Sequence, residues 1–452
     1  MLKVVVATEP QAHEAYLRHC ILEGYDTLTT KPMLLPIKNG TFDGPSVFRR
    51  TADLLSLSPA TADARHSLLV LGRHHEVYDK SVRAQASHMV DILGTPITSV
   101  NLKTAGGVWN VGSEFSTRDD HPYKHGYGML MHGAYHYVDI LARMLLINRR
   151  LYPDADFVMK ISGYAAFPAD QDVRVTDCVT KRLSHHSESM SMLQPGIRYG
   201  ETDIVTAFSL QFKNTRKVLA LGNLALEQTT PGMRSWGPFP EVPYNINGRL
   251  HCTDVDVRLG TVFSVNGNVV KVPLGSRKGQ NDLRGKNLAT ITTRANAYVA
   301  GTQEFIAEER IARPYGNSFS YAAESELFEA WIEGRKTYSE LASHLLGAAL
   351  ISALSEVISE NGVETIIDFN FAEPDWPDPQ LPACAVCDED GAMQFAAEGL
   401  AVEAIDPQLQ ALDAKCGLGA LSAQLLIAFG DGGVTGRNGR LQKRDPGEEI
   451  SG

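Results

Sequence analysis

The sequence predicts an α/β parallel sheet followed by a larger, mostly antiparallel open sheet with helices on one face. The chain opens on a continuous apolar run at residues 4–7, which is typical of a strand buried on both faces of a parallel sheet. A helical stretch and a second strand follow by residue 29, which completes a βαβ unit. Later strands are longer and alternate in polarity, as expected for an antiparallel sheet with one open face.

The first 75 residues carry the parallel part of the fold. Residues 12–22 predict a helix that ends at Gly24, and residues 27–29 predict a strand that Pro32 stops. After a polar stretch around a weak helix, residues 68–71 predict a third apolar strand. We therefore expect three parallel strands, which form a partial Rossmann-like sheet.

From residue 95 onward the sequence predicts longer strands than in the first part of the chain. Residues 204–212 alternate between apolar and smaller or polar side chains, which predicts a half-buried strand. Residues 261–265 and 269–272 are joined by Asn266 and Gly267, and this pair predicts a type I′ hairpin turn. A largely antiparallel sheet is the expected result.

A long helix and a linker complete the organisation. Residues 337–360 predict a helix that opens on a capping box of Thr337 with Glu340 and returns to the first part of the fold. Four prolines between residues 373 and 382 predict an extended linker. A helical segment near residues 411–429 and a glycine-rich tail follow.

Composition excludes several classes of protein. With 452 residues, 43% hydrophobic and 21% charged, the chain is long enough for two or more cored domains. Its net charge of −11 argues against a nucleic-acid partner, because binding phosphates needs a basic face. Six scattered cysteines form no disulfide framework and favour the reducing cytoplasm. We see no run of ~20 apolar residues that would cross a membrane.

Cys384 and Cys387 form a single C-x-x-C, and no second pair follows it. A structural zinc site needs four ligands. We therefore assign no metal or redox role to this pair.

Two blocks of sequence resemble one known family. Residues 4–34, VVVATEPQAHEAYLRHCILEGYDTLTTKPML, look like a half-domain in which a strand ends in A-T-P, a His follows, and the next strand ends in E-K-P. Residues 126–141, GYGMLMHGAYHYVDIL, look like a helix with the pattern G-G-G-x-L-x-D-x-G-x-H-x-x-D. Both patterns belong to the glucose-fructose oxidoreductase/inositol dehydrogenase-like family of nicotinamide-dependent sugar oxidoreductases.

The resemblance implies a nicotinamide-dependent oxidoreductase that uses NAD or NADP and a small sugar-like or cyclitol-like alcohol. It implies a truncated dinucleotide-binding domain at residues 1–75, a substrate and oligomerisation domain at 76–362, and a linker with a C-terminal extension at 363–452. The expected cofactor-binding residues are Thr8, Pro10, His13, Thr30, Lys31 and Pro32. We also expect a homo-oligomer, because helices on one face of a large sheet leave the other face in need of a partner.

Lys31, His136 and His132 are the expected catalytic residues. A lysine held between a strand end and a proline extends from the carboxyl edge of a parallel sheet, where open α/β folds bind ligands. Its charge would favour the alkoxide-like oxygen that forms as hydride leaves a carbinol. His136 would act as general base to the hydroxyl, and Asp139, one turn on, would orient a neighbour or the substrate domain.

Three positions depart from the family pattern. Thr30 stands where the family has Glu, His132 where it has Asp, and Ala134 where it has Gly. The change at 132 also makes two i, i+4 pairs, His121 with His125 and His132 with His136, which suggests metal ligation from one helix face. No carboxylate of the H-E-x-x-H kind accompanies these histidines, so we assign no metal.

The largest departure from the family pattern is the missing glycine-rich motif of the dinucleotide-binding domain. No strand with G-x-G-x-x-G precedes Val4, and LLIAFGDGGVTG at residues 425–436 misses that pattern because Thr435 replaces the third glycine. We interpret the latter as a flexible tail rather than a permuted motif, and expect weak NAD or NADP binding. Two alternatives stay open: a cofactor-deficient relative that serves as a binding or assembly module, and an NAD-dependent glycosidase of the same fold.

Overall fold

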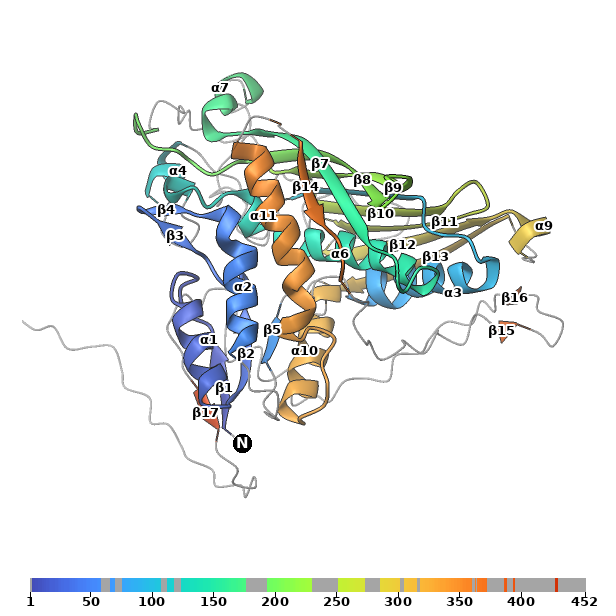
Figure 1. Cartoon of the computed structure of the whole chain (residues 1–452), viewed down its shortest axis with the longest axis horizontal. Coiled ribbons are helices and arrows are strands. Elements are labelled where there is room, and N and C mark those ends of the chain that lie inside the picture. Colours follow the sequence, from blue (N-terminus) through green and yellow to red (C-terminus); the bar gives the residue numbers. More distant parts are fainter. Residues whose placement is uncertain are drawn as a thin grey trace, which may run out of the picture.

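The computed structural model places a small sheet beside a much larger one, with helices between them (Figure 1). The structure describes residues 2–57, 66–69, 75–106, 112–117, 123–175, 193–229, 251–272, 285–300, 305–314, 318–359, 362, 364–371, 386–387, 393–394 and 427–429. Cys384, His121, the proline-rich residues 373–382, the proposed helical residues 411–426 and Thr435 lie outside this part of the chain.

The small sheet has the order β17-β1-β2-β5. Its strands are β1 (Lys3–Val6), β2 (Asp26–Thr30), β5 (His66–Leu69) and β17 (Ile427–Phe429). β1 pairs with β2 and β2 with β5 in parallel, so the three predicted parallel strands are confirmed. The helix α1 (His13–Leu22) joins the first two strands, and Gly24, with φ of +68°, ends the connection as predicted. The weak helix is α2 (Val47–Ser56).

β17 corrects two expectations for the C-terminal region. Residues 427–429 form a strand, whereas the sequence predicted the end of a helix and a flexible tail. The strand pairs with β1 in the antiparallel sense, with Phe429 opposite Lys3, and an antiparallel strand also contradicts a permuted dinucleotide motif. The outer edge of β1 offers unpaired backbone groups, and a short apolar strand satisfies them.

The large sheet has nine strands in the order β13-β12-β11-β10-β6-β9-β8-β7-β14. They are β6 (Ser99–Ala105), β7 (Phe157–Ala166), β8 (Asp203–Phe212), β9 (Val218–Glu227), β10 (His251–Leu259), β11 (Phe263–Lys271), β12 (Lys286–Ala295), β13 (Ile306–Pro314) and β14 (Thr365–Asp368). All neighbours are antiparallel except β6 and β9. The fold class predicted from the sequence is therefore confirmed.

The predicted hairpin turn at Asn266 and Gly267 is wrong. β11 runs through both residues without a break, and the chain reverses instead at Gly260, whose φ is +56°. A Cβ atom at position 267 would lie 2.6 Å from Cγ2 of Val82. Gly267 is thus explained by close packing of a helix on the sheet, which a local turn rule does not detect.

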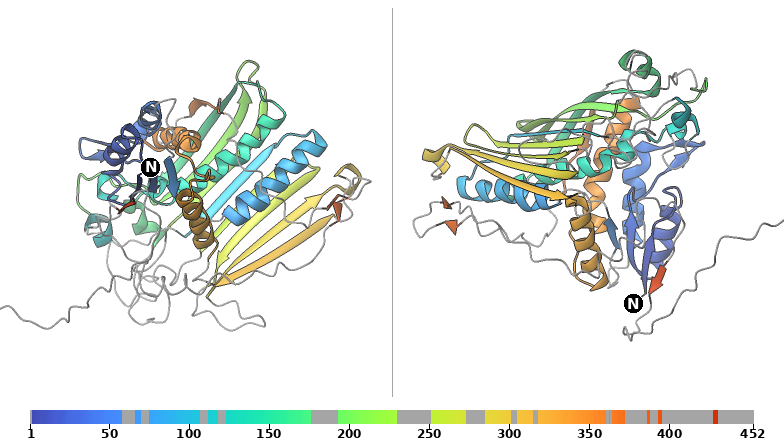
Figure 2. Two further views of the ribbon diagram at one scale, coloured as in Figure 1. Left: turned by 90° about the horizontal axis from the view of Figure 1, so that it is seen from below. Right: turned by 180° about the vertical axis from the view of Figure 1, so that it is seen from behind.

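Helices α3 (Ala84–Leu93), α6 (Ala134–Leu146) and α11 (Leu345–Ser359) lie along one face of the large sheet (Figure 2). The other described helices are α4 (Gly112–Thr117), α5 (Met129–His132), α7 (Gln171–Arg174), α9 (Ala297–Ala300) and α10 (Phe319–Ile332), with a π-helix at His75–Arg83 and a 3₁₀ turn at Leu341–His344. Every residue of α6 is buried. This helix is therefore the centre of the core between the two sheets.

α11 connects the two sheets, as the sequence predicted for the long helix. The Ser352 hydroxyl accepts from the Phe48 N–H at 2.9 Å and donates to the Gly44 carbonyl at 3.2 Å. The helix begins at Leu345 rather than at Thr337. The Glu340 carboxylate does accept from the Thr337 N–H at 2.9 Å, but in the segment before the helix.

The stretch Leu341–Ser359 is long and apolar enough to cross a membrane by length and composition, contrary to our expectation from the sequence. In the fold, 72% of its 18-residue apolar window is buried inside the protein. It serves as a core helix in the described structure, because its apolar side chains pack between α2, α6 and β7.

Candidate functional site

The carboxyl edge of the small sheet collects the residues of the first motif block. β1 and β2 are parallel, with Val6 opposite Thr29, so the chain leaves both strands at the same edge. The residues at this edge are Thr8 and Pro10 after β1, and Thr30, Lys31 and Pro32 at the end of β2. Open α/β sheets bind their ligands at such an edge.

Lys31 brings the two motif blocks together. Its half-buried Nζ donates a hydrogen bond to the main-chain carbonyl of His132 at 2.5 Å. The two residues are 101 positions apart in the sequence. The side chain expected from one block therefore touches the backbone of the other.

The two predicted histidines lie on neighbouring helices. His132 ends α5, His136 is in the first turn of α6, and Gly133 separates the two helices. His132 is half-buried and His136 is 4% exposed. His136 follows the residue that Lys31 contacts by four positions in the chain. Within the described part of the chain, no group of three or more His, Cys, Asp or Glu side chains is placed to hold a metal.

His13 contacts both loops that form this edge of the small sheet. Its fully buried ring contacts the Pro32 carbonyl through Nδ1 at 2.7 Å and the Thr8 carbonyl through Nε2 at 3.0 Å. Burial lowers the pKa of His13, and the two carbonyls oppose that shift. A neutral ring has one N–H, so it donates to one of the two carbonyls and lies against the other. His13 acts on the edge through the two loops that it contacts.

Two buried hydroxyls lie along these strands without hydrogen-bond partners among the described residues. They are Oγ1 of Thr8 and Oγ1 of Thr29. A buried hydroxyl without a partner costs free energy. Thr8, at the strand end, therefore has hydrogen-bonding capacity that no described contact uses.

Glu201 is a site residue that sequence reasoning missed. Its buried carboxylate accepts from the Leu130 N–H through Oε1 at 2.7 Å, at the start of α5. Burial raises the pKa of Glu201 to about 7, with the backbone hydrogen bonds and the Arg198 charge opposing the rise. No motif marks this residue, because its place depends on a contact between segments 71 positions apart.

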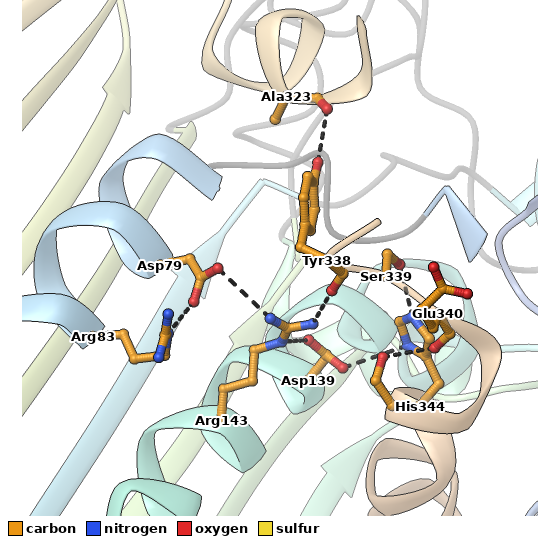
Figure 3. Close-up of polar contacts among 10 residues, drawn as sticks. Asp79, Arg83, Asp139, Arg143, Ala323, Tyr338, Ser339, Glu340 and His344 are labelled. Atoms are coloured by element: carbon orange, nitrogen blue, oxygen red, sulfur yellow. Dashed lines mark hydrogen bonds and ion pairs between the residues drawn. The ribbon is translucent and has the colours of Figure 1, made fainter. Parts of the chain in front are cut away.

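A buried ion network surrounds the other half of α6 (Figure 3). The Nε of Arg143 donates to Asp139 at 2.7 Å, its Nη2 donates to the Tyr338 carbonyl at 2.9 Å, and its Nη1 lies 3.7 Å from Asp79. Arg83 also contacts Asp79. Asp139 is thus the direct acceptor for Arg143, and the orienting role expected for it from the sequence stays a prediction.

The same network contains a serine, a histidine and an aspartate in series. Oγ of Ser339 lies 2.8 Å from Nε2 of His344, whose Nδ1 lies 3.4 Å from Asp139. Such an order suggests nucleophilic catalysis. However, Ser339 and His344 are fully buried, and burial, followed by the Arg143 charge, lowers the pKa of His344 to about 3. A base of that strength is too weak near neutral pH, so the series is structural.

No family model matches the chain, and no curated protein matches its sequence. It is similar to the solved structure of an oxidoreductase from Agrobacterium radiobacter with NAD+, L-tartaric acid and magnesium, at 14% identity and a TM-score of 0.42, covering 81% of this chain and 79% of that one. It is similar to levoglucosan dehydrogenase with NADH and levoglucosan, at 13% identity and a TM-score of 0.46, covering 82% and 80%. It is also similar to an inositol dehydrogenase homolog from Azotobacter vinelandii with NADH and myo-inositol, at 11% identity and a TM-score of 0.42, covering 80% and 77%. Similarity at this level assigns neither substrate nor activity to this chain.

Proposed function

We propose that this protein is a nicotinamide-dependent oxidoreductase that acts on a sugar-like or cyclitol-like alcohol. The observation that carries the proposal is the hydrogen bond between Nζ of Lys31 and the His132 carbonyl. It joins a cation at the carboxyl edge of a parallel sheet to the end of α5, and α6, which bears His136, begins two residues later. An ammonium group and an imidazole are the groups that alcohol oxidation needs for charge and proton transfer.

The edge of the small sheet fits part of a dinucleotide. The unpartnered Thr8 hydroxyl offers a hydrogen bond there, and Pro10, Thr30, Lys31 and Pro32 flank it. These residues would hold the nicotinamide end, which accepts or donates hydride when the cofactor is bound. The sequence contains no G-x-G-x-x-G turn for the pyrophosphate, so we expect an affinity weaker than micromolar.

Each side chain has a distinct chemical role in this proposal. His136 takes the proton of the substrate hydroxyl, since a neutral imidazole is a suitable base near pH 7. The Lys31 ammonium stabilises the negative charge that gathers on the same oxygen. His13 keeps the loops of Thr8 and Pro32 in place, so that Lys31 is held at the reacting oxygen.

The test is a screen of the whole chain with NAD or NADP, at concentrations above the expected affinity, against cyclitols and aldoses. We expect nicotinamide reduction, followed by absorbance, with at least one polyol. The variant His132→Asp rebuilds the carboxylate that the family resemblance implies, and it should raise the activity. No reduction with any polyol by either protein would contradict the proposal and favour a binding module.

We also propose that the open face of the large sheet joins two copies of the chain. Among the described residues, Tyr164, Val205 and Leu221 are 74%, 57% and 56% exposed on neighbouring strands β7, β8 and β9. A nine-stranded face offers on the order of 1,000 Å², and a standard interface uses about 800 Å² per partner. Tyr164→Lys with Val205→Lys should yield monomers in light scattering, and Tyr298→Lys, at an exposed position on α9, should not. A monomeric wild-type protein would contradict this arrangement.

A further inference from the structure

The one-turn helix α5 is held at both ends by charged side chains from distant segments. At its start, the Glu201 carboxylate accepts from the Leu130 N–H at 2.7 Å. At its end, the Lys31 ammonium donates to the His132 carbonyl at 2.5 Å. A negative group at the start and a positive group at the end both match the polarity of the helical backbone.

The Glu201 backbone is fixed against the same helix. Its carbonyl accepts from the Met129 N–H at 2.7 Å. Gly128 and Gly200 allow the two segments to touch, since a Cβ at 128 would lie 2.3 Å from the Glu201 nitrogen, and one at 200 would lie 2.3 Å from the Gly128 nitrogen. Glu201 therefore cannot move away from α5 without moving the backbone of both segments.

The charge environment of Glu201 is simple. Within the described residues, Arg198, in the segment before β8, is the charged side chain that acts on this carboxylate. His132 and Lys31 stand at the other end of α5. Burial is the dominant influence and brings the pKa of Glu201 to about 7, so the charge of this carboxylate changes near neutral pH.

We propose that Glu201 is a proton-dependent positioning residue that sets the place of the Lys31 ammonium through α5. Ionised, Glu201 is a strong acceptor for the Leu130 N–H and holds the turn firmly. Protonated, it is a weaker acceptor, and the turn and its terminal carbonyl gain freedom. The Lys31 ammonium donates to that carbonyl, so its position changes when the carbonyl moves. The functional meaning of this coupling rests on the proposed oxidoreductase activity, but the coupling itself does not.

The coupling is measured directly on Lys31. Reductive methylation with ¹³C-formaldehyde labels the lysines of the whole chain and leaves Lys31 one N–H for its hydrogen bond, and Lys31→Arg identifies the Lys31 signal. We expect the chemical shift of this signal to change in a step centred near pH 7, where Glu201 ionises. Glu201→Gln keeps an oxygen for the Leu130 N–H but cannot ionise, so the step should disappear.

Asp203→Asn is the matched control. Asp203 is a buried carboxylate on the same segment, but it accepts from Gln228 and Thr229 and not from α5. The step should persist in this variant. A Lys31 signal without a step near pH 7 in the wild-type protein would overturn the proposal, as would a step that survives Glu201→Gln, because the neighbouring His132 would then be its source. A step without nicotinamide activity would contradict the proposed function and leave the coupling intact.

Discussion

The polar groups at the two ends of helix α6 have different kinds of partner. At the C-terminal end, Arg143 contacts Asp139, Asp79 and the Tyr338 carbonyl, and the charges of this buried network are matched (Figure 3). At the N-terminal end, the Lys31 ammonium donates to the backbone carbonyl of His132. Nearby, the hydroxyl of Thr8 lacks a partner among the described residues.

From this difference we infer that the C-terminal end of α6 stabilises the fold, whereas the N-terminal end lies at the candidate site. A buried network in which each charge meets an opposite charge holds its elements together and exposes little to a ligand. A buried hydroxyl that lacks a partner among the described residues, as at this strand edge, costs free energy. Such sites are common where a bound molecule completes the hydrogen bonds.

The largest expected effect is the loss of Arg143. Replacement by Met removes the arginine that pairs with the buried Asp139 and leaves Asp79 with Arg83, and we expect a loss of about 3–5 kcal/mol in the free energy of unfolding. Urea denaturation measures this quantity. Arg335→Met is the control, since Arg335 and Glu333 form an exposed pair that contributes about 0–1 kcal/mol. Equal losses in the two variants would contradict the structural role of the network.

The second effect is a pH dependence of stability from Glu201. Its folded pKa of about 7 lies above the ordinary value of 4.5, so the folded state binds the proton more tightly. The stabilisation is complete below pH 4.5 and is lost as pH rises through 7, by about 3 kcal/mol in total. His344, with a pKa lowered from 6.5 to about 3, gives the opposite slope. The difference between wild type and Glu201→Gln isolates the Glu201 contribution, and a difference that does not change with pH would contradict it.

Local pattern was sufficient to predict the βαβ unit of the small sheet. Its strands are short, the first is a run of valines, and a glycine follows the helix between the first two strands, so each element is encoded by neighbouring residues. The edge position of Lys31 followed from the same pattern. Its contact with His132 agrees with the expected closeness of the two motif blocks, although the roles of these residues stay predictions.

Contacts between distant segments limited the prediction elsewhere. Asn266 and Gly267 form a turn signal, but Gly267 serves the packing of Val82 on a continuous strand. The helix expected from Thr337 begins eight residues later, at Leu345, and the Tyr338 carbonyl in between is an acceptor for Arg143. Local sequence rules do not show which distant residue packs on a glycine or hydrogen-bonds a backbone carbonyl.

The smallest expected effect concerns the unpartnered hydroxyl. Thr8→Val removes a polar group that has no partner among the described residues, so the free energy of unfolding should change by less than about 0.5 kcal/mol. Thr51→Val is the control, because that buried hydroxyl donates to the Val47 carbonyl at 2.8 Å and its loss should cost about 1 kcal/mol. Calorimetric titration of Thr8→Val should show weaker binding of NAD. A clear loss of stability with unchanged binding would assign Thr8 to the core instead.

The central claim is that Lys31 serves chemistry rather than stability, and the variant Lys31→Ala tests it most directly when turnover and unfolding are measured on the same sample. We expect turnover of the polyol identified in the screen to fall by ~10²–10⁴-fold. The free energy of unfolding should fall by no more than about 1–2 kcal/mol, the value of one charged hydrogen bond. Lys38→Ala, at an exposed position in the short strand β3 (Ile37–Lys38), which pairs with β4 (Thr41–Phe42), should change neither quantity. If Lys31→Ala instead loses as much stability as Arg143→Met while each folded molecule keeps its turnover, Lys31 is a structural residue and the proposed site is wrong.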